Sequence, residues 1–428
     1  MSNVAGDAAL PASPSEASPA RIFWSTWAGW MLDGFDAGLY GFVLVAALTD
    51  LLPASGIEVS KANVAAYGGL LFSIFMLGWA CSMFWGWLAD RIGRVRTLCA
   101  TIITYSIFTA CCGLAPTIAV FAVFRFLAGF GIGGEWAAGT PLLHESVPET
   151  MRVRLAGWLH SATPIGLTLA AVVALGALPV LGWRGLFLIG VLPSLLALYL
   201  RLTLPEPRPP ATRAQPPIAA LFTAEQARST WSAALMMACI IFGLWSSTFW
   251  IPTLVITKLV EEGAGAGYAQ SMAALSGVLT NLGTLIGCLA MPWLTQLAGG
   301  RKRTAYMFFL GAMATNILFY MAIVPAARGI ALLFAFLPVL GFFTNGVFAL
   351  YTIWLPELFP SALRGLGSGF AFSAGRLLGA VGPSVVGLLV ATIGGGYPRA
   401  VAVVSLIYLL GLPTITWARE TSAEPLRA

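Results

Sequence analysis

Long apolar runs separated by short polar stretches make up the chain from about residue 20 onward. Most runs reach or exceed about 20 residues, the length that an α-helix needs to cross the hydrocarbon core of a bilayer. Glycine, proline and charged residues bound the runs, as expected of the turns between helices. The pattern predicts twelve membrane spans, at approximately residues 22–49, 64–89, 97–115, 117–143, 153–178, 183–203, 229–257, 268–298, 304–324, 329–354, 364–392 and 397–417.

A proline-rich segment divides the predicted spans into two groups of six. Six of the fourteen residues from Leu204 to Pro217 are proline, and a helix cannot continue through such a run. We therefore predict an all-α membrane protein with two six-helix bundles, flanked by cytoplasmic tails, the first of them disordered. The N-terminal tail, first bundle, cytoplasmic linker, second bundle and C-terminal tail are predicted at residues 1–20, 21–203, 204–228, 229–418 and 419–428.

The amino-acid composition agrees with a membrane protein. The chain is 58% hydrophobic and 9% charged, with a mean hydropathy of +0.86, whereas soluble domains carry about 25% charged residues. The net charge of +6 therefore bears on topology rather than on binding to nucleic acid. The six cysteines show neither disulfide nor metal-ligand spacing, so we expect no metal site and no cofactor.

Lysine and arginine residues set the predicted orientation. With both termini in the cytoplasm, sixteen of the 23 lie in inner loops and tails and five lie outside. This distribution follows the positive-inside rule. It predicts a multi-pass protein of the cell (inner) membrane, and it leaves Arg125 and Arg376 inside spans.

Two carboxylates, Asp33 and Asp36, lie in the middle of the first apolar run. Their spacing puts both on one helix face, and an ionised Asp at the bilayer midplane costs roughly 3 kcal/mol. Intramembrane acids usually mark ion or substrate paths, so we interpret the pair as a proton-coupling site. A polar pair that only joins helices is the alternative. Gly34 and Gly38 form a strip of small residues that predicts a close helix contact.

The two predicted bundles repeat each other. Four residue types that follow the fourth span recur after the tenth span at a single offset of 212 residues. The matched pairs are Glu145 and Glu357, Pro148 and Pro360, Arg152 and Arg364, and Gly157 and Gly369. An internal repeat of six spans is typical of a transporter whose halves rock about a central site.

The loop between the second and third spans resembles the signature of the major facilitator superfamily. Residues 86–96 read Gly-Trp-Leu-Ala-Asp-Arg-Ile-Gly-Arg-Val-Arg, as this family has between its second and third helices. The resemblance covers residues 21–420 and implies the major facilitator fold. At a helix end, Asp90 can accept hydrogen bonds from Arg91 or Arg94 and so act as a conformational latch. The second copy of the loop lacks the aspartate.

Within that superfamily, the sequence Asp-Gly-Phe-Asp at residues 33–36 resembles the motif of proton symporters for organic acids. Residues 125–136, which run from an arginine to a Glu-Trp pair through a glycine-rich stretch, resemble the segment that accompanies this motif. Both the aromatic acid and the sialate symporter families carry the combination. The resemblance implies proton-coupled import of a monocarboxylate and does not choose between the two families.

Charged residues near the membrane midplane suggest a division of roles. Arg376 is a permanent planar cation suited to binding a substrate carboxylate, with a structural ion pair as the alternative. Asp33, Asp36 and Glu135 can be neutralised by protonation, and we expect Asp36 or Glu135 to carry the coupled proton. Arg125 lies ten residues, roughly 15 Å, from Glu135 along the same helix. It therefore needs another acid as its buried charge partner.

Charged residues at the inner ends of the spans complete the predicted latch. Glu145 and Glu357 are each followed by an arginine, Arg152 and Arg364, seven residues later. We expect these residues to form inner-surface ion pairs that rocking breaks and remakes.

Polar and aromatic side chains of the seventh and tenth spans could select the substrate. Trp245, Asn345 and Tyr351 are the first choices, and stacking on a ring would favour an aromatic acid. Helix packing or lipid contact is the alternative for each. We interpret His144 and His160 as packing or topology residues in preference to a proton relay.

Together these features predict a secondary active transporter that imports a small organic acid, an aromatic carboxylate, with protons by alternating access. Its expected partners are the substrate anion, protons and the lipid bilayer, without nucleic acid, and the chain is expected to act as a monomer. A symporter for sialate or another sugar acid and a drug or metabolite exporter by proton antiport are the alternatives. An enzyme is not expected, because no span carries a nucleophile with a nearby base.

Overall fold

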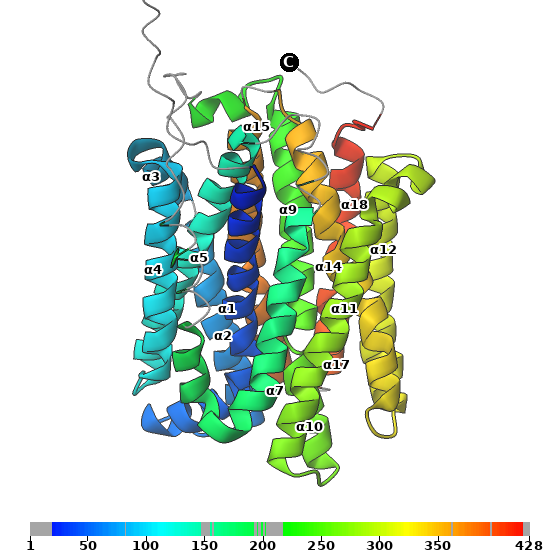
Figure 1. Ribbon diagram of the computed structural model, residues 1–428. Helices are drawn as coiled ribbons and strands as arrows, with labels where there is room; N and C mark the ends of the chain where they lie inside the picture. The colour runs from blue at the N-terminus through cyan, green and yellow to red at the C-terminus, as the bar shows by residue number, and fades with distance from the viewer. Residues whose placement is uncertain are drawn as a thin grey trace, which may run out of the picture.

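A computed structural model describes most of the chain between residues 19 and 422. The described residues are 19–81, 83–146, 155, 158–191, 195, 198–199, 202, 217–360, 363–393 and 396–422. They form long helices that pack side by side, with no strand among them (Figure 1). The predicted N-terminal tail to residue 18 and the proline-rich part of the linker up to residue 216 lie outside the described residues.

The described helices fall before and after the linker, and we call them the N-terminal helices and the C-terminal helices. The N-terminal helices are α1 (Pro19–Ala54), α2 (Lys61–Ala80), α3 (Met83–Ile92), α4 (Arg94–Gly113), α5 (Ile118–Ser146) and α7 (Ala162–Ile189). The C-terminal helices are α9 (Ala227–Thr248), α10 (Ile251–Glu261), α11 (Ala266–Ala298), α12 (Arg301–Leu318), α13 (Val324–Ala326), α14 (Ala331–Glu357), α15 (Arg364–Gly379), α16 (Val381–Thr392), α17 (Gly396–Val404) and α18 (Ile407–Trp417). A 3-10 helix, η1 (Ile218–Phe222), precedes α9, and a π-helical turn, η2 (Phe319–Ile323), joins α12 to α13.

Eleven helical stretches of the described residues are long and apolar enough to cross a membrane, against the twelve predicted. The difference lies at the predicted fifth and sixth spans, which run together in α7. Gly182, whose φ of 65° is in the left-handed region, marks the turn between them. The predicted sixth span then continues into residues that are mostly outside the described part. The prediction of an all-α, multi-span membrane protein is confirmed.

The seventh and eleventh predicted spans are among those that divide into two helices. The seventh divides into α9 and α10 at Phe249 and Trp250, just before Pro252, which has no N–H to continue the helical hydrogen bonds. The eleventh divides into α15 and α16 at Ala380. Such breaks within a membrane are tolerated where the chain lines a cavity.

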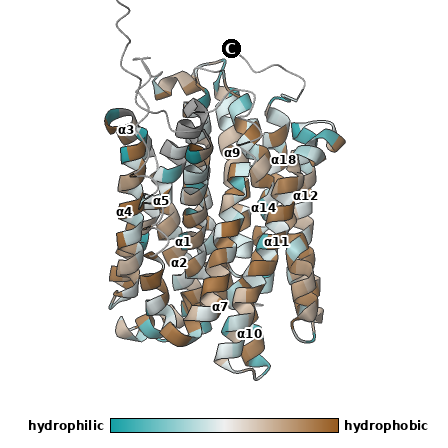
Figure 2. Cartoon of the chain, viewed as in Figure 1, coloured by the Kyte–Doolittle hydropathy of each residue, from teal (hydrophilic) through white to brown (hydrophobic). Residues whose placement is uncertain are grey.

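The outer surface of the helices is apolar, as contact with lipid requires. Large apolar side chains such as Ile107, Leu289 and Leu388 are 53%, 59% and 59% exposed. Hydrophobic residues occupy most of the length of the helices, whereas hydrophilic residues are more frequent toward the helix ends (Figure 2). In Figure 1, α1 begins and α18 ends toward the upper end, where α3 also lies on the left, and α10 lies at the lower end.

Glycines allow close contact between helices, as predicted for α1. A Cβ atom on Gly34 would lie 2.6 Å from the Thr163 carbonyl oxygen, and one on Gly38 would lie 3.0 Å from Leu167 Cδ2. The predicted close helix contact is therefore confirmed, and α7 is the partner of α1.

Between the N-terminal and C-terminal helices, α2 packs against α16 through Gly69. A Cβ atom there would lie 2.4 Å from the Pro383 carbonyl oxygen. Ser73 and Ser384 share a hydrogen bond of 2.7 Å across the same contact. The two sets of helices thus meet directly at this contact.

Candidate functional site

A central cavity lies between the N-terminal and C-terminal helices. Its walls come from α1, α2, α7 and the turn before it, α9, α10, α11, α14 and α15. Its volume is about 160 Å³. Because most of the wall is apolar and only a few polar groups interrupt it, the cavity suits one small organic molecule held by a few oriented contacts.

Arg376 provides the positive charge of the cavity wall. It lies in the last turn of α15 and is 5% exposed. Its guanidinium carbon lies 4.6 Å from the ring centre of Trp79, on α2, and its charge interacts with that of Asp33 on α1. One side chain of the C-terminal helices therefore packs against Trp79 and interacts electrostatically with Asp33, on two N-terminal helices, and both residues also line the cavity.

A second pair of charged residues, Asp36 and Arg125, is enclosed among the N-terminal helices. Asp36 is 2% exposed and Arg125 is 1% exposed, and their charges interact without a direct hydrogen bond between them. The Thr109 hydroxyl donates to Asp36 Oδ2 at 3.4 Å. Neither Asp36 nor Arg125 is among the described residues that line the cavity.

Two rings take the place of hydrogen-bond partners around Arg125. Its guanidinium carbon lies 4.5 Å from the ring centre of Tyr40 and 4.1 Å from that of Phe75. Its Nε and Nη2 atoms have no hydrogen-bond partner among the described residues. The sequence predicts that Arg125 pairs with an acid other than Glu135, which lies ten residues away on α5. Asp36 is the acid that interacts with it.

The remaining candidate residues divide between the cavity and the protein interior. Trp245 and Asn345 line the cavity. Tyr351 is fully buried, is not among the lining residues, and donates its hydroxyl to Met236 Sδ at 3.8 Å. Glu135 is also fully buried and is not among the lining residues.

Sequence reasoning missed several residues of the cavity wall, among them Trp79 and His160. Trp79 lies in an apolar run without any feature that separates it from a lipid-facing tryptophan. His160, which we assigned to packing, lines the cavity beside Trp30 and Phe348, with ring centres 6.1 Å and 5.8 Å away. A lone polar residue inside an apolar span was the available signal for His160.

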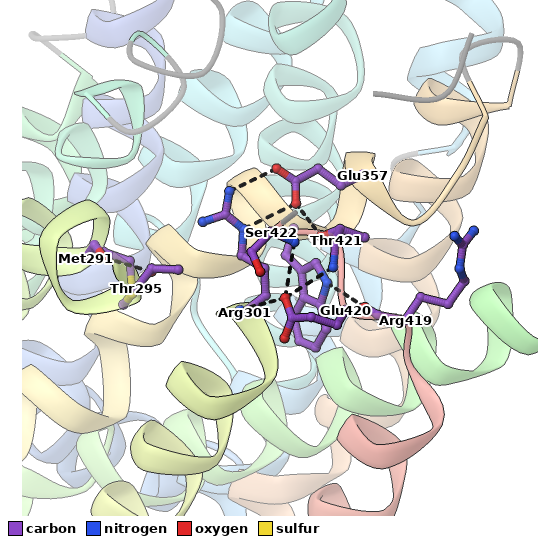
Figure 3. Close-up of polar contacts among 9 residues, drawn as sticks. Met291, Thr295, Arg301, Glu357, Arg419, Glu420, Thr421 and Ser422 are labelled. Carbon is purple, nitrogen blue, oxygen red and sulfur yellow. Dashed lines mark hydrogen bonds and ion pairs between the residues drawn. The ribbon is translucent and has the colours of Figure 1, made fainter. Parts of the chain in front are cut away.

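An electrostatic network connects the ends of several C-terminal helices (Figure 3). Arg301 donates to both carboxylate oxygens of Glu357, at 3.0 Å and 3.2 Å. Thr421 donates its hydroxyl to Glu357 at 2.5 Å. Glu357, a predicted latch residue, thus joins the end of α14 to the start of α12 and to the segment after α18.

The neighbouring Glu420 caps α12. Its carboxylate accepts the backbone N–H groups of Arg301 and Lys302, each at 2.9 Å. Burial alone would raise the pKa of Glu420, but these N–H donors together with Ser422 outweigh it and hold the pKa below its ordinary value. A carboxylate at this place also complements the positive end of the helix dipole.

The other predicted latch residues are less fully described. Arg91 is exposed and lies over the Trp87 ring, 4.0 Å from its centre. Arg94 is partly buried, and Arg364 donates Nε to the Pro356 carbonyl at 3.1 Å. The side chains of Asp90, Glu145 and Arg152 lie outside the described part of the structure, as does that of His144.

At the opposite end of the molecule, an ion pair joins the two sets of helices. Lys61, at the start of α2, and Glu261, at the end of α10, are 2.5 Å apart. Both side chains are more than half exposed, at 80% and 57%, so this pair contributes about 1 kcal/mol at most.

Comparison with known proteins bears on these observations. The family model described as Major Facilitator Superfamily matches residues 26–383. A putative niacin/nicotinamide transporter of Bacillus subtilis is 27% identical over 85% of this chain and 86% of its own length. A cis,cis-muconate transport protein of Acinetobacter baylyi is 27% identical over 95% of this chain and 98% of its own. Other relatives are named as transporters of gentisate, benzoate and sialic acid.

Solved structures give the same fold. A crystal structure described as a D-xylose-proton symporter has a TM-score of 0.73 with this chain and covers 96% of it, at 19% sequence identity. Its own length is covered completely. At this identity the likeness concerns the arrangement of helices.

Proposed function

Because the chain belongs to the major facilitator superfamily, whose members are transporters and not enzymes, we propose that it imports a small aromatic carboxylate with protons. The cargo binds in the central cavity, which opens to one side of the membrane at a time. In this proposal the chain lies in the cell membrane with both termini in the cytoplasm, as its positive charges favour.

The position of Arg376 carries this proposal. Its guanidinium lines an otherwise largely apolar cavity, between the rings of Trp79 and Phe372 at 4.6 Å and 5.5 Å. A carboxylate can bind the planar fork through two hydrogen bonds, while an aromatic ring stacks on the neighbouring side chains. The names of the relatives, which include niacin, gentisate and benzoate, support the same class of cargo.

Proton coupling follows from competition for Arg376. In the absence of cargo, Arg376 interacts with Asp33, which lines the same cavity. A substrate carboxylate that binds Arg376 takes over this cation, and Asp33 then becomes a carboxylate in an apolar wall without its counter-charge. Asp33, rather than Asp36 or Glu135 as the sequence led us to expect, takes up a proton under those conditions, since it alone of the three lines the cavity among the described residues and protonation removes the cost of an isolated buried charge. Binding of the anion and of the proton are thereby linked.

The test is uptake by the purified chain in proteoliposomes with an imposed pH gradient. Benzoate, nicotinate, cis,cis-muconate and sialate form the substrate panel. We expect an acidic exterior to drive uptake of an aromatic acid and the exterior to become alkaline as uptake proceeds. Uptake of sialate but of no aromatic acid would show that the cargo is a sugar acid. Uptake that is the same with and without the pH gradient would show that transport is not coupled to protons. Efflux driven by the same gradient would indicate an antiporter.

A further inference from the structure

His160 brings an additional polar group to the cavity from the N-terminal side. It belongs to the helical turn before α7 and is 8% exposed. Its Nδ1 atom lies 3.1 Å from the hydroxyl oxygen of Thr352 on α14. Its ring lies nearly parallel to that of Phe348, at 8°, and edge-on to Trp30, at 83°. Contacts on three sides therefore fix the orientation of the imidazole.

The Thr352 hydroxyl determines which imidazole nitrogen carries the proton. A hydroxyl has one proton to donate, and that of Thr352 lies 3.0 Å from the Phe348 carbonyl oxygen one helical turn earlier. Threonine in a helix commonly donates to this carbonyl. Thr352 then accepts from His160, so Nδ1 carries the hydrogen. This assignment follows from the hydrogen-bond network.

The other nitrogen of His160, Nε2, is left as an acceptor that reaches the cavity. His160 is 8% exposed in a largely apolar cavity wall. Such burial disfavours the charged form, so the imidazole is neutral and has a single N–H. Nε2 has no hydrogen-bond partner among the described residues, and it is not among the polar atoms that are closed off from open space. Because His160 lines the cavity, this lone pair faces the cargo.

We propose that His160 is a specificity-determining residue, which selects cargo that bears a hydrogen-bond donor in addition to its carboxylate. The inference rests on the proposed function, in which Arg376 binds the carboxylate. A ring hydroxyl is the simplest donor on an aromatic acid, and it satisfies a buried acceptor that plain benzoate leaves unpaired. Asn345, three residues before Phe348 on α14, adds an amide to the same wall.

The test compares uptake of benzoate, its monohydroxylated forms and the matching methoxybenzoates, which lack the donor. For the unmodified chain we expect the best hydroxybenzoate to have a KM about tenfold lower than benzoate, with no such gain for its methoxy counterpart. His160→Phe, which keeps an aromatic ring but has no acceptor, should bring that ratio to about one while uptake of benzoate persists.

Two variants at Thr352 separate the acceptor from a structural role. Thr352→Val keeps the shape but removes the acceptor for Nδ1–H, so the proton can move to Nε2. We expect this variant to lose the preference for the hydroxyl and to gain affinity for the methoxybenzoate, whereas Thr352→Ser keeps the original preference. Equal KM values for benzoate and hydroxybenzoates in the unmodified chain would overturn the inference alone, as would a preference that survives in His160→Phe. Absence of uptake for every aromatic acid would overturn the proposed function as well.

Discussion

Asp33 and Asp36 lie three residues apart on one helix, yet their surroundings differ. Asp33 lines the cavity and interacts with Arg376, which comes from the C-terminal helices. Asp36 is enclosed with Arg125, which comes from the N-terminal helices and packs under the rings of Tyr40 and Phe75. The first pair crosses the boundary between the two sets of helices, which move relative to each other in the proposed transport cycle. The second pair does not.

This difference indicates separate roles for the two pairs. A pair that spans the moving boundary and borders the cavity is exposed to the cargo, which can replace one partner. A pair inside one set of helices is independent of the cargo. Because both side chains are buried, each charge depends on the other as its counter-charge, and removing one partner destabilises that set. We therefore expect changes to Asp36 and Arg125 to affect stability first, and changes to Asp33 and Arg376 to affect binding and coupling first.

The largest effect is expected from Asp36→Asn. This variant leaves Arg125 as a buried cation without its acid, which should destabilise the N-terminal helices by about 3 kcal/mol. Thermal unfolding of the purified protein in detergent measures the loss. The double variant Asp36→Asn with Arg125→Met should recover most of the stability, because replacing both charges by apolar groups removes the uncompensated cation. A double variant as unstable as the single one would contradict the pairing.

Arg376→Lys is expected to raise the KM for the cargo about 100-fold while stability changes little. Lysine keeps the positive charge but cannot offer the planar fork that binds a carboxylate through two hydrogen bonds. Initial rates of uptake at varied concentrations give the KM. Arg328→Lys, at an exposed arginine beyond η2, is the matched control and should behave as the unmodified chain. A KM unchanged in Arg376→Lys would assign Arg376 to a structural ion pair.

Asp33→Asn should reduce accumulation driven by a pH gradient about tenfold, while exchange of cargo across the membrane continues. Asparagine resembles protonated aspartate in shape and charge, so the cavity still accepts the anion but no longer requires a proton. Accumulation with and without the gradient, measured beside counterflow exchange, separates the two steps. Asp50→Asn on the same helix serves as the control, because Asp50 pairs with Arg184 and lies outside the central cavity. If Asp33→Asn keeps its coupling to the pH gradient, another acid carries the coupled proton.

Much of this arrangement could be predicted from the sequence, and the reasons for the rest are physical. The membrane spans follow from runs of apolar residues, and the charged side chains near the midplane stand out against that background. Which arginine faces which aspartate depends on how each helix is rotated, and the apolar pattern here surrounds each helix without a distinct polar face. For that reason Asp36 could not be assigned to Arg125 in advance, and Tyr351 was taken for a cavity residue although it packs against Met236.

The break in the seventh span and the junction in α7 also could not be predicted from the sequence alone. Pro252 and Gly182 are visible in the sequence, but other prolines, such as Pro338 on α14, lie inside unbroken helices. Whether a proline ends a helix depends on the neighbouring backbone groups, which only the packed structure supplies.

Glu420 provides a comparison for the two buried aspartates, because it is a partly exposed carboxylate with hydrogen-bond donors of its own. If burial makes the aspartates important, a change at Glu420 should have a smaller effect. Glu420 accepts the N–H groups of Arg301 and Lys302 at the start of α12, with its side chain partly exposed. Glu420→Gln keeps an acceptor oxygen but removes the charge, so we expect a loss of only about 0.5 kcal/mol at neutral pH. The hydrogen bonds lower the pKa of Glu420 in the folded protein, so its contribution is complete above the ordinary value of 4.5 and declines as the pH falls below it. Thermal unfolding of the unmodified chain and of Glu420→Gln across that range should show that their difference in stability decreases as the pH falls. A difference in stability that stays constant with pH would mean that the charge of Glu420 plays no part in capping α12.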